Sequence, residues 1–233
     1  MQAIILAGGL GTRLSGAVPH VPKPMAAMGE EPFLATLLRY AYAQGVREVV
    51  LALHHQADII RGYFGDGFAG LSLRYSIEHT PLGTGGAIKK ALAMMRADAP
   101  VLVMNGDSLV MLDYAEMLAA HCAAGSKITL ASVAMPVTAR YSKLTVEDGR
   151  ISHYALLGDD QPGDISAGFY VMQPDIFARY LLPEIFSFER DFLARHTPHI
   201  RPSCFPRVEY FIDIGIPEDY ARAQIEVPHM LAA

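Results

Sequence analysis

The stretch Gln-Ala-Ile-Ile-Leu-Ala-Gly-Gly at residues 2–9 is the strongest indication of the fold class. Its continuous apolar run predicts a strand buried on both faces of a sheet, and the glycine pair ends that strand. Similar runs follow at 46–53 and 101–104, and stretches with apolar residues at helical spacing alternate with them. This β-α alternation through about residue 135 predicts a mostly parallel sheet with helices on both faces.

The rest of the chain changes character, with shorter strands, more proline and shorter helices. Because no linker or repeat separates the parts, we predict one α/β domain over residues 1–233. The predicted architecture is a Rossmann-like three-layer sandwich, with a nucleotide-binding type of half at about 1–135 and a second half at about 136–233 that completes the pocket. The other expected elements are strands at 71–77, 127–134, 142–146, 166–172 and 208–214, and helices at 33–43, 56–64, 84–96, 113–123, 174–180, 188–195 and 217–226.

The composition excludes several classes of protein. Of the 233 residues, 52% are hydrophobic and 18% are charged, which excludes a disordered chain. The net charge of −5 and the lack of a basic run argue against nucleic acid or an anionic membrane surface as partners. Cys122 and Cys204 form neither a disulfide framework nor a metal-ligand pattern. No apolar run reaches the roughly 18–20 residues of a membrane helix, and no basic region opens the chain, so we expect a cytoplasmic protein.

Two loops carry the first chemical signals. The loop Leu-Ala-Gly-Gly-Leu-Gly-Thr-Arg-Leu at 6–14 has three glycines, which let backbone N–H groups approach a polyphosphate closely. Arg13 adds a planar cation that suits phosphate oxygens. The loop lacks the Gly-Lys-Ser/Thr of a P-loop, and Leu14 stands where a dinucleotide fingerprint has glycine. Ten residues on, Val-Pro-Lys-Pro-Met at 21–25 holds Lys23 in a stiff backbone between two prolines.

Together, Gly-Gly-x-Gly-Thr-Arg-Leu and Pro-Lys-Pro resemble the signature of the sugar-1-phosphate nucleotidylyltransferase family. Three later segments match that family as well: Glu-His-Thr-Pro-Leu-Gly-Thr-Gly-Gly at 78–86, Asn-Gly-Asp at 105–107 and Phe-Ile-Asp-Ile-Gly at 211–215. The resemblance covers nearly the whole chain and implies a GT-A-like nucleotide-diphospho-sugar transferase fold. The implied reaction converts an NTP and a sugar 1-phosphate, both small molecules, to an NDP-sugar and pyrophosphate. The resemblance leaves open whether the protein forms a homodimer.

The resemblance also implies roles for individual residues. Asp107 and Asp213 are expected to hold Mg²⁺ as cofactor, since carboxylates among apolar neighbours are costly to bury without a cation. Arg13 is expected to hold the departing pyrophosphate, and Lys23 to lie between the two reacting phosphates. Glu78 is expected to accept the N1–H and 2-amino donors of guanine. The expected nucleotide-binding residues are Leu6, Ala7, Gly8, Gly9, Gly11, Thr12, Glu78, Gly83, Thr84 and Asn105, and the expected sugar-binding residues are Tyr141, Ser166 and Gly168.

Several of these residues also have plain structural interpretations. Thr84 is a candidate cap for the helix at 84–96. Gly168 is expected to leave room for the sugar ring, and an ordinary strand with one small residue stays an alternative. His54-His55 is interpreted as a strand end rather than a metal pair, and the segment 186–191 as mainly structural.

The specificity prediction rests on overall likeness. The chain looks closest to bacterial guanylyltransferases acting on D-glycero-α-D-manno-heptose 1-phosphate for surface polysaccharides. A mannose-1-phosphate guanylyltransferase and a uridylyl- or cytidylyltransferase stay open as alternatives, and a glycosyltransferase or a non-catalytic sugar-nucleotide sensor is a more distant one.

One departure from the family pattern weakens the assignment of the sugar. Many relatives carry Phe-x-Glu-Lys-Pro, whose Glu binds sugar hydroxyls and whose Lys binds the sugar phosphate, whereas the run at 151–158 here has neither.

Overall fold

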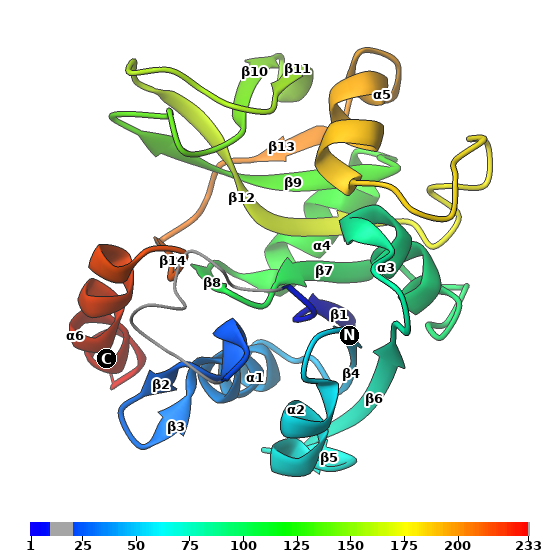
Figure 1. The fold of residues 1–233 in the computed structure, drawn as a ribbon. Coiled ribbons are helices and arrows are strands. Elements are labelled where there is room, and N and C mark those ends of the chain that lie inside the picture. Colours follow the sequence, from blue (N-terminus) through cyan, green and yellow to red (C-terminus); the bar gives the residue numbers. More distant parts are fainter. Residues whose placement is uncertain (10–20, 233) are drawn as a thin grey trace.

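A single ten-stranded sheet forms the centre of the molecule in the computed structural model, which describes residues 1–9 and 21–232 (Figure 1). The strand order is β10-β11-β13-β9-β12-β7-β1-β4-β6-β5. In chain order these strands are β1 (Gln2–Leu6), β4 (Glu48–Leu53), β5 (Gly67–Phe68), β6 (Leu71–Ile77), β7 (Val101–Asn105), β9 (Ile128–Met135), β10 (Lys143–Glu147), β11 (Arg150–Ala155), β12 (Gly163–Met172) and β13 (Ser203–Phe205).

The predicted parallel sheet is confirmed for the strands of the first half. Strand β1 pairs in parallel with both β4 and β7, and β4 pairs in parallel with β6. The second half adds mixed directions, because β12 runs antiparallel to β7 and β9. The carboxyl ends of β1, β4 and β7 therefore meet at one edge, where ligands of such sheets bind.

Helices cover both faces of the sheet and complete the predicted three layers. Alternate residues of β1 point to opposite faces, so Ala3 and Ile5 enter one apolar core and Ile4 enters the other. The first core is covered by α1 (Phe33–Ala43), α2 (Ala57–Phe64), α4 (Tyr114–Ala123) and α6 (Pro217–Ala232), and the second by α3 (Gly83–Leu92), the π-helix η2 (Phe188–Leu193) and α5 (Ala194–Ile200). No helix within residues 1–9 and 21–232 is both long and apolar enough to cross a membrane.

Short elements bring distant parts of the chain to the ligand edge. Strand β14 (Tyr210–Asp213) pairs antiparallel with β8 (Ser108–Met111), and this pairing sets Asp213 opposite Ser108. A 3-10 turn, η1 (Lys23–Met25), precedes the small hairpin of β2 (Ala27–Met28) and β3 (Glu31–Pro32).

Two predicted helices differ from the structure in their ends: α3 ends at Leu92 instead of 96, and α6 continues to Ala232 instead of ending at 226. Two more differ in kind. Residues 174–180 form successive turns closed by bonds such as that from the Ile176 N–H to the Gln173 carbonyl, and Pro183 follows before a helix could develop. The helix expected at 188–195 begins as the π-helix η2 and continues as α5 to Ile200.

Candidate active site

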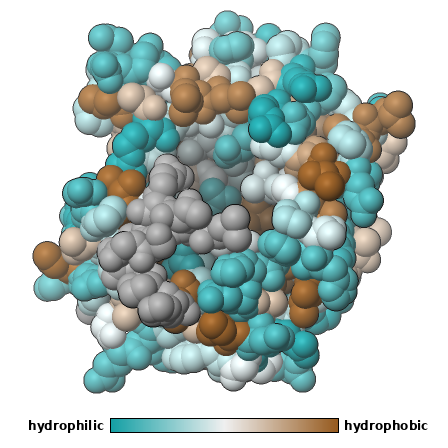
Figure 2. Space-filling model, viewed as in Figure 1, coloured by the Kyte–Doolittle hydropathy of each residue, from teal (hydrophilic) through white to brown (hydrophobic). Residues whose placement is uncertain are grey.

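A cavity of about 490 Å³ opens where β1, β4 and β7 end. Its volume is within the range of small-molecule sites, and Figure 2 shows the surface hollowed near the middle of this face. The cavity is lined by Leu6, Ala7, Gly8, Gly9, Lys23, Pro24, Ala52, His54, Glu78, Pro81, Gly83, Thr84, Ala87, Asn105, Asp107 and Gly215. Every predicted nucleotide-binding residue that the structure describes is among them. Gly11, Thr12 and Arg13 lie outside the described residues.

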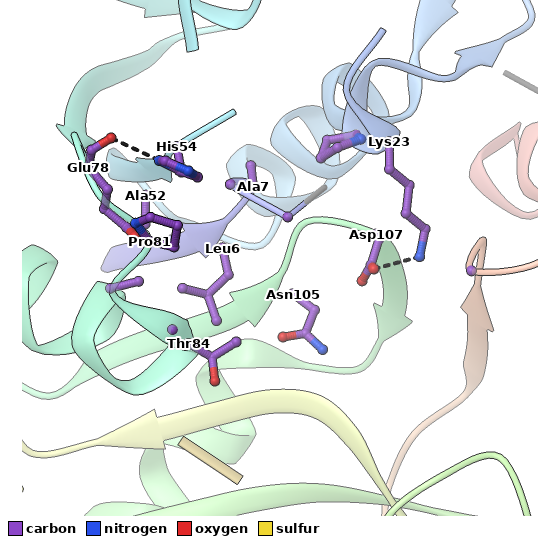
Figure 3. Close-up of a pocket in the computed structure, with 16 residues that line it drawn as sticks. Leu6, Ala7, Lys23, Ala52, His54, Glu78, Pro81, Thr84, Asn105 and Asp107 are labelled. Atoms are coloured by element: carbon purple, nitrogen blue, oxygen red, sulfur yellow. Dashed lines mark hydrogen bonds and ion pairs between the residues drawn. The ribbon is translucent and has the colours of Figure 1, made fainter. Parts of the chain in front are cut away.

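One end of the cavity carries Glu78, which follows β6 and is only 8% exposed. One of its carboxylate oxygens accepts a 2.8 Å bond from the Leu82 N–H, and the Glu78 carbonyl is 3.0 Å from Nδ1 of His54 (Figure 3). The bond to Leu82 fixes the orientation of the carboxylate. The second oxygen has no hydrogen-bond partner among the described residues, so it can accept a further hydrogen bond.

His54 was not predicted as a site residue, because its position at the end of β4 is equally typical of an ordinary strand terminus. The structure places it on the cavity wall, held by the Glu78 carbonyl. Gly8 explains why this wall is so close to β1: a Cβ on Gly8 would lie 2.8 Å from the His54 backbone nitrogen. The glycine therefore permits the contact between two neighbouring strand ends.

The amino end of α3 packs against a segment from the second half of the chain. The N–H of Gly85 donates to the Phe186 carbonyl at 2.9 Å, and a Cβ on Gly85 would lie 2.1 Å from the Phe186 ring. Thr84 does not cap the helix, which was one interpretation of its sequence: Leu82 holds the cap position, and the Thr84 hydroxyl accepts from the Phe188 N–H at 2.9 Å. Gly85 of this loop therefore allows α3 to pack closely against Phe186.

The opposite end of the cavity joins three charged side chains from separate parts of the chain. Nζ of Lys23 lies 2.6 Å from the Asp107 carboxylate and 3.4 Å from that of Asp213 (Figure 3 shows the first pair). The Lys23 side chain is only 10% exposed. A Cβ on Gly215 would lie 2.8 Å from Asp213 and 3.2 Å from Nζ of Lys23, so glycine is needed beside the cluster.

This cluster has more negative than positive charge. Burial raises the pKa of Asp213, the neighbouring Asp107 carboxylate raises it further, and Lys23 and the Gly215 N–H lower it. Two converging carboxylates with one ammonium leave a net charge of −1, which favours a further cation. Within the described residues no group of three or more His, Cys, Asp or Glu side chains converges. The pair fits Mg²⁺, which takes few protein carboxylates and completes its shell with phosphates and water.

The three predicted sugar-binding residues, Tyr141, Ser166 and Gly168, are not among the residues that line the cavity. Tyr141 packs edge-on against Phe211 at 5.8 Å between ring centroids, and the hydroxyl of Ser166 is 3.5 Å from that of Tyr170. Gly168 has φ of +70°, and a Cβ there would lie 2.4 Å from Nδ2 of Asn105. The space beside Gly168 is therefore occupied by Asn105 instead of being open for a sugar ring, so this glycine positions a cavity residue.

Comparison with known proteins agrees with this geometry. A family model described as nucleotidyl transferase matches residues 2–228. The chain belongs to the nucleotidyl transferase family.

Its relatives within the family are close. The chain is 40% identical over 231 residues to the D-glycero-alpha-D-manno-heptose 1-phosphate guanylyltransferase of Aneurinibacillus thermoaerophilus, covering 99% of this chain and 100% of that one. It is 41% identical over 221 residues to the enzyme of the same name from Campylobacter jejuni, with 94% and 97% covered. The crystal structure of HddC from Yersinia pseudotuberculosis superposes with a TM-score of 0.84 at 36% identity, covering 96% and 97% of the two chains. Mannose-1-phosphate guanylyltransferases are more distant, at 32% for that of Mycobacterium tuberculosis.

Proposed function

We propose that this chain transfers the guanylyl group of GTP to a manno-configured heptose 1-phosphate and releases pyrophosphate. One observation carries the proposal: a single cavity has a carboxylate suited to a nucleobase at one end and the Lys23-Asp107-Asp213 cluster at the other. A nucleoside triphosphate has this polarity, with a neutral base and a polyanionic tail. The likeness to heptose 1-phosphate guanylyltransferases supports the choice of both substrates.

Catalysis in this proposal rests on positioning and charge. The acceptor phosphate is already an anionic nucleophile at neutral pH, so the reaction requires no general base. Lys23, held by Pro22 and Pro24 at η1, is the described cation that would stabilise charge shared between the two reacting phosphates. The polyphosphate would lie along the Gly8 and Gly9 backbone, and Arg13 would bind the leaving pyrophosphate.

Asp107 and Asp213 would hold Mg²⁺, because both carboxylates converge on one point and their own repulsion favours a divalent cation. When bound, the ion supplies charge neutralisation at the phosphates during nucleotidyl transfer. Ser108 assists the arrangement, because its hydroxyl donates to Asp107 at 3.3 Å and Asp213 lies opposite it on the paired strand β14.

Guanine selection would come from Glu78. The free carboxylate oxygen could accept from the N1–H and 2-amino groups of guanine, whereas adenine presents an unprotonated N1 on that edge. The fixed orientation from the Leu82 N–H reduces the entropy lost when a base binds.

Pyrophosphate release tests the proposal directly. GTP, ATP, UTP and CTP are each combined with Mg²⁺ and with heptose, mannose and glucose 1-phosphates. We expect release with GTP and the manno-heptose 1-phosphate above all other pairs. Release with a different pair would retain the reaction and reject the specificity. No release with any pair, while an NDP-sugar still binds, would reject nucleotidyl transfer in favour of a sensor or a glycosyltransferase.

A further inference from the structure

Glu189 is an unusual carboxylate in this fold. It is a half-buried residue on η2, where it follows Phe188, and the rings of Phe188 and Phe192 on the same helix are fully buried. Within the described part of the chain, no Lys, Arg or His forms an ion pair with it, although its neighbours Arg190 and Asp191 pair with each other. Burying a carboxylate without a cation costs free energy, so a site that keeps one usually has a use for it.

Hydroxyl groups surround this carboxylate instead of cations. Burial raises the pKa of Glu189, and the hydroxyls of Tyr154 and Tyr170, which face the carboxyl, lower it. Tyr154 is only 2% exposed, yet among the described residues its hydroxyl makes no hydrogen bond of normal distance and angle. The hydroxyl of Ser166 lies beside that of Tyr170 at 3.5 Å. The cluster is polar and incompletely bonded, which is the condition of a site that completes its bonds with a ligand.

The cluster adjoins the cavity described above. The N–H of Phe188, the residue before Glu189, donates to the Thr84 hydroxyl on the cavity wall. On the other side, Asp107 is near enough that its charge raises the pKa of Glu189. Thr84, Asn105 and Asp107 follow one side of the cavity in Figure 3. Glu189 therefore lies next to the part of the site where the acceptor meets the nucleotide.

The acceptor needs such a group. A sugar 1-phosphate presents several hydroxyl donors, and a carboxylate can accept two or more of them with charge-assisted bonds. The run at 151–158, which lies on β11 and the turn after it, contributes no carboxylate. It contributes Tyr154 instead, whose hydroxyl faces Glu189.

We propose that Glu189 is a specificity-determining residue that accepts hydrogen bonds from ring hydroxyls of the sugar 1-phosphate, so that η2 supplies the carboxylate that β11 lacks. This assignment rests on the proposed function, because it requires a sugar 1-phosphate as acceptor. Tyr154 would orient the carboxylate and take its missing hydrogen bond when the sugar arrives.

Glu189→Gln tests the assignment, with Asp191→Asn as the matched control on the same helix. The Asp191 carboxylate bonds the Ser187 N–H and Arg190, so its substitution removes the same charge away from the cluster. We expect Glu189→Gln to raise the KM for the sugar 1-phosphate by about 10- to 100-fold, the loss typical of an unpaired polar contact with substrate. The KM for GTP should stay within twofold. Asp191→Asn should change neither KM by more than twofold.

Monodeoxy sugar 1-phosphates sharpen the test. In the wild-type protein, the KM for at least one analogue should be raised as much as Glu189→Gln raises the KM for the full sugar 1-phosphate. Assaying that analogue with the variant should raise the KM no further. Additive losses for every analogue, or equal rises in both KM values, would overturn the assignment and leave a structural role. If Glu189→Gln does not fold, Glu189→Asp serves instead, because it keeps the charge and shortens the side chain by one methylene. An unchanged KM for the sugar 1-phosphate in that variant would overturn the assignment. Failure of the wild-type protein with every sugar 1-phosphate would instead overturn the proposed function.

Discussion

Replacing Asp213 by Asn should stabilise the fold while removing activity. One oxygen of Asp107 and one of Asp213 contact the Lys23 ammonium, at 2.6 and 3.4 Å, so these two oxygens lie at most about 6 Å apart. Two like charges at that separation repel by about 3 kcal/mol at an effective dielectric constant of 20 and by under about 1 kcal/mol in water. Because the Asp107 and Asp213 side chains are 35% and 21% exposed, we take the repulsion between them as about 1 kcal/mol.

The raised pKa of Asp213 gives the sign of the net effect. Burial and Asp107 together outweigh the attraction of Lys23, so the ionised carboxyl costs the folded state free energy. The wild-type chain therefore loses this part of its stability as the pH rises through the raised pKa. Asn keeps the shape and can still accept the Gly215 N–H, and Lys23 keeps its shorter contact with Asp107.

We expect Asp213→Asn to raise Tm at pH 7 in EDTA by about 2–4 °C, the shift that about 1 kcal/mol produces in a chain of this size. The difference should narrow as the pH falls and disappear below the ordinary value of 3.8. Pyrophosphate release with Mg²⁺ should fall by about 10²–10³-fold. A Tm that falls by more than 2 °C at pH 7, or turnover within tenfold of the wild-type protein, would refute the reasoning.

The remaining predictions concern four other positions. Lys23→Met should lower kcat by about 10²–10³-fold with the fold retained by circular dichroism, and near-full turnover would reject its role. Glu78→Ala should lower the GTP-to-ATP ratio of kcat/KM by about 10- to 100-fold, and an unchanged ratio would exclude it from base selection. Gly168→Ala should cost about 1–2 kcal/mol in urea unfolding from its positive φ and reduce turnover by displacing Asn105, so unchanged values in both assays would contradict the geometry. His121 is fully buried, and burial lowers its pKa to about 4. The free energy of unfolding should therefore decrease by up to about 1.4 kcal/mol per pH unit as the pH falls from 6.5 toward 4. This decrease should be absent in His121→Gln, and an equal pH dependence in both proteins would show that His121 is not its origin.

Continuous apolar runs made the parallel part of the sheet predictable. Strands β1, β4 and β7 are buried on both faces, so their sequences are apolar apart from one terminal residue each and stand out from the helices between them. The short strands β8 and β13 were not predicted, because they depend on distant partners. Ser108 pairs with Asp213, 105 residues away, and Ser203 pairs with Thr129, 74 residues away. Their sequences contain too few residues for a period to be recognised.

The candidate site was predictable where its residues follow strands or match family motifs. Glu78, Asn105 and Asp107 were predicted on that basis, and all three line the cavity. The segment of Glu189 was interpreted as structural, because the role proposed for Glu189 depends on Tyr154, which lies on a different element. Pairings of this kind exist only after folding, and a single sequence carries no period or spacing that reveals them.

The contact between Gly85 and Phe186 has a consequence for anyone recombining members of this family. Phe186 and Gly85 are bonded backbone to backbone and have no room for a Cβ between them. The segment that leads to Glu189 is thereby held against α3, the helix that follows Glu78. A chimera that exchanges acceptor-binding parts must therefore move residues 182–193 together with the loop at 82–86. Exchanged alone, either piece would meet a mismatched surface, so the two substrate preferences are expected to be inherited as one module.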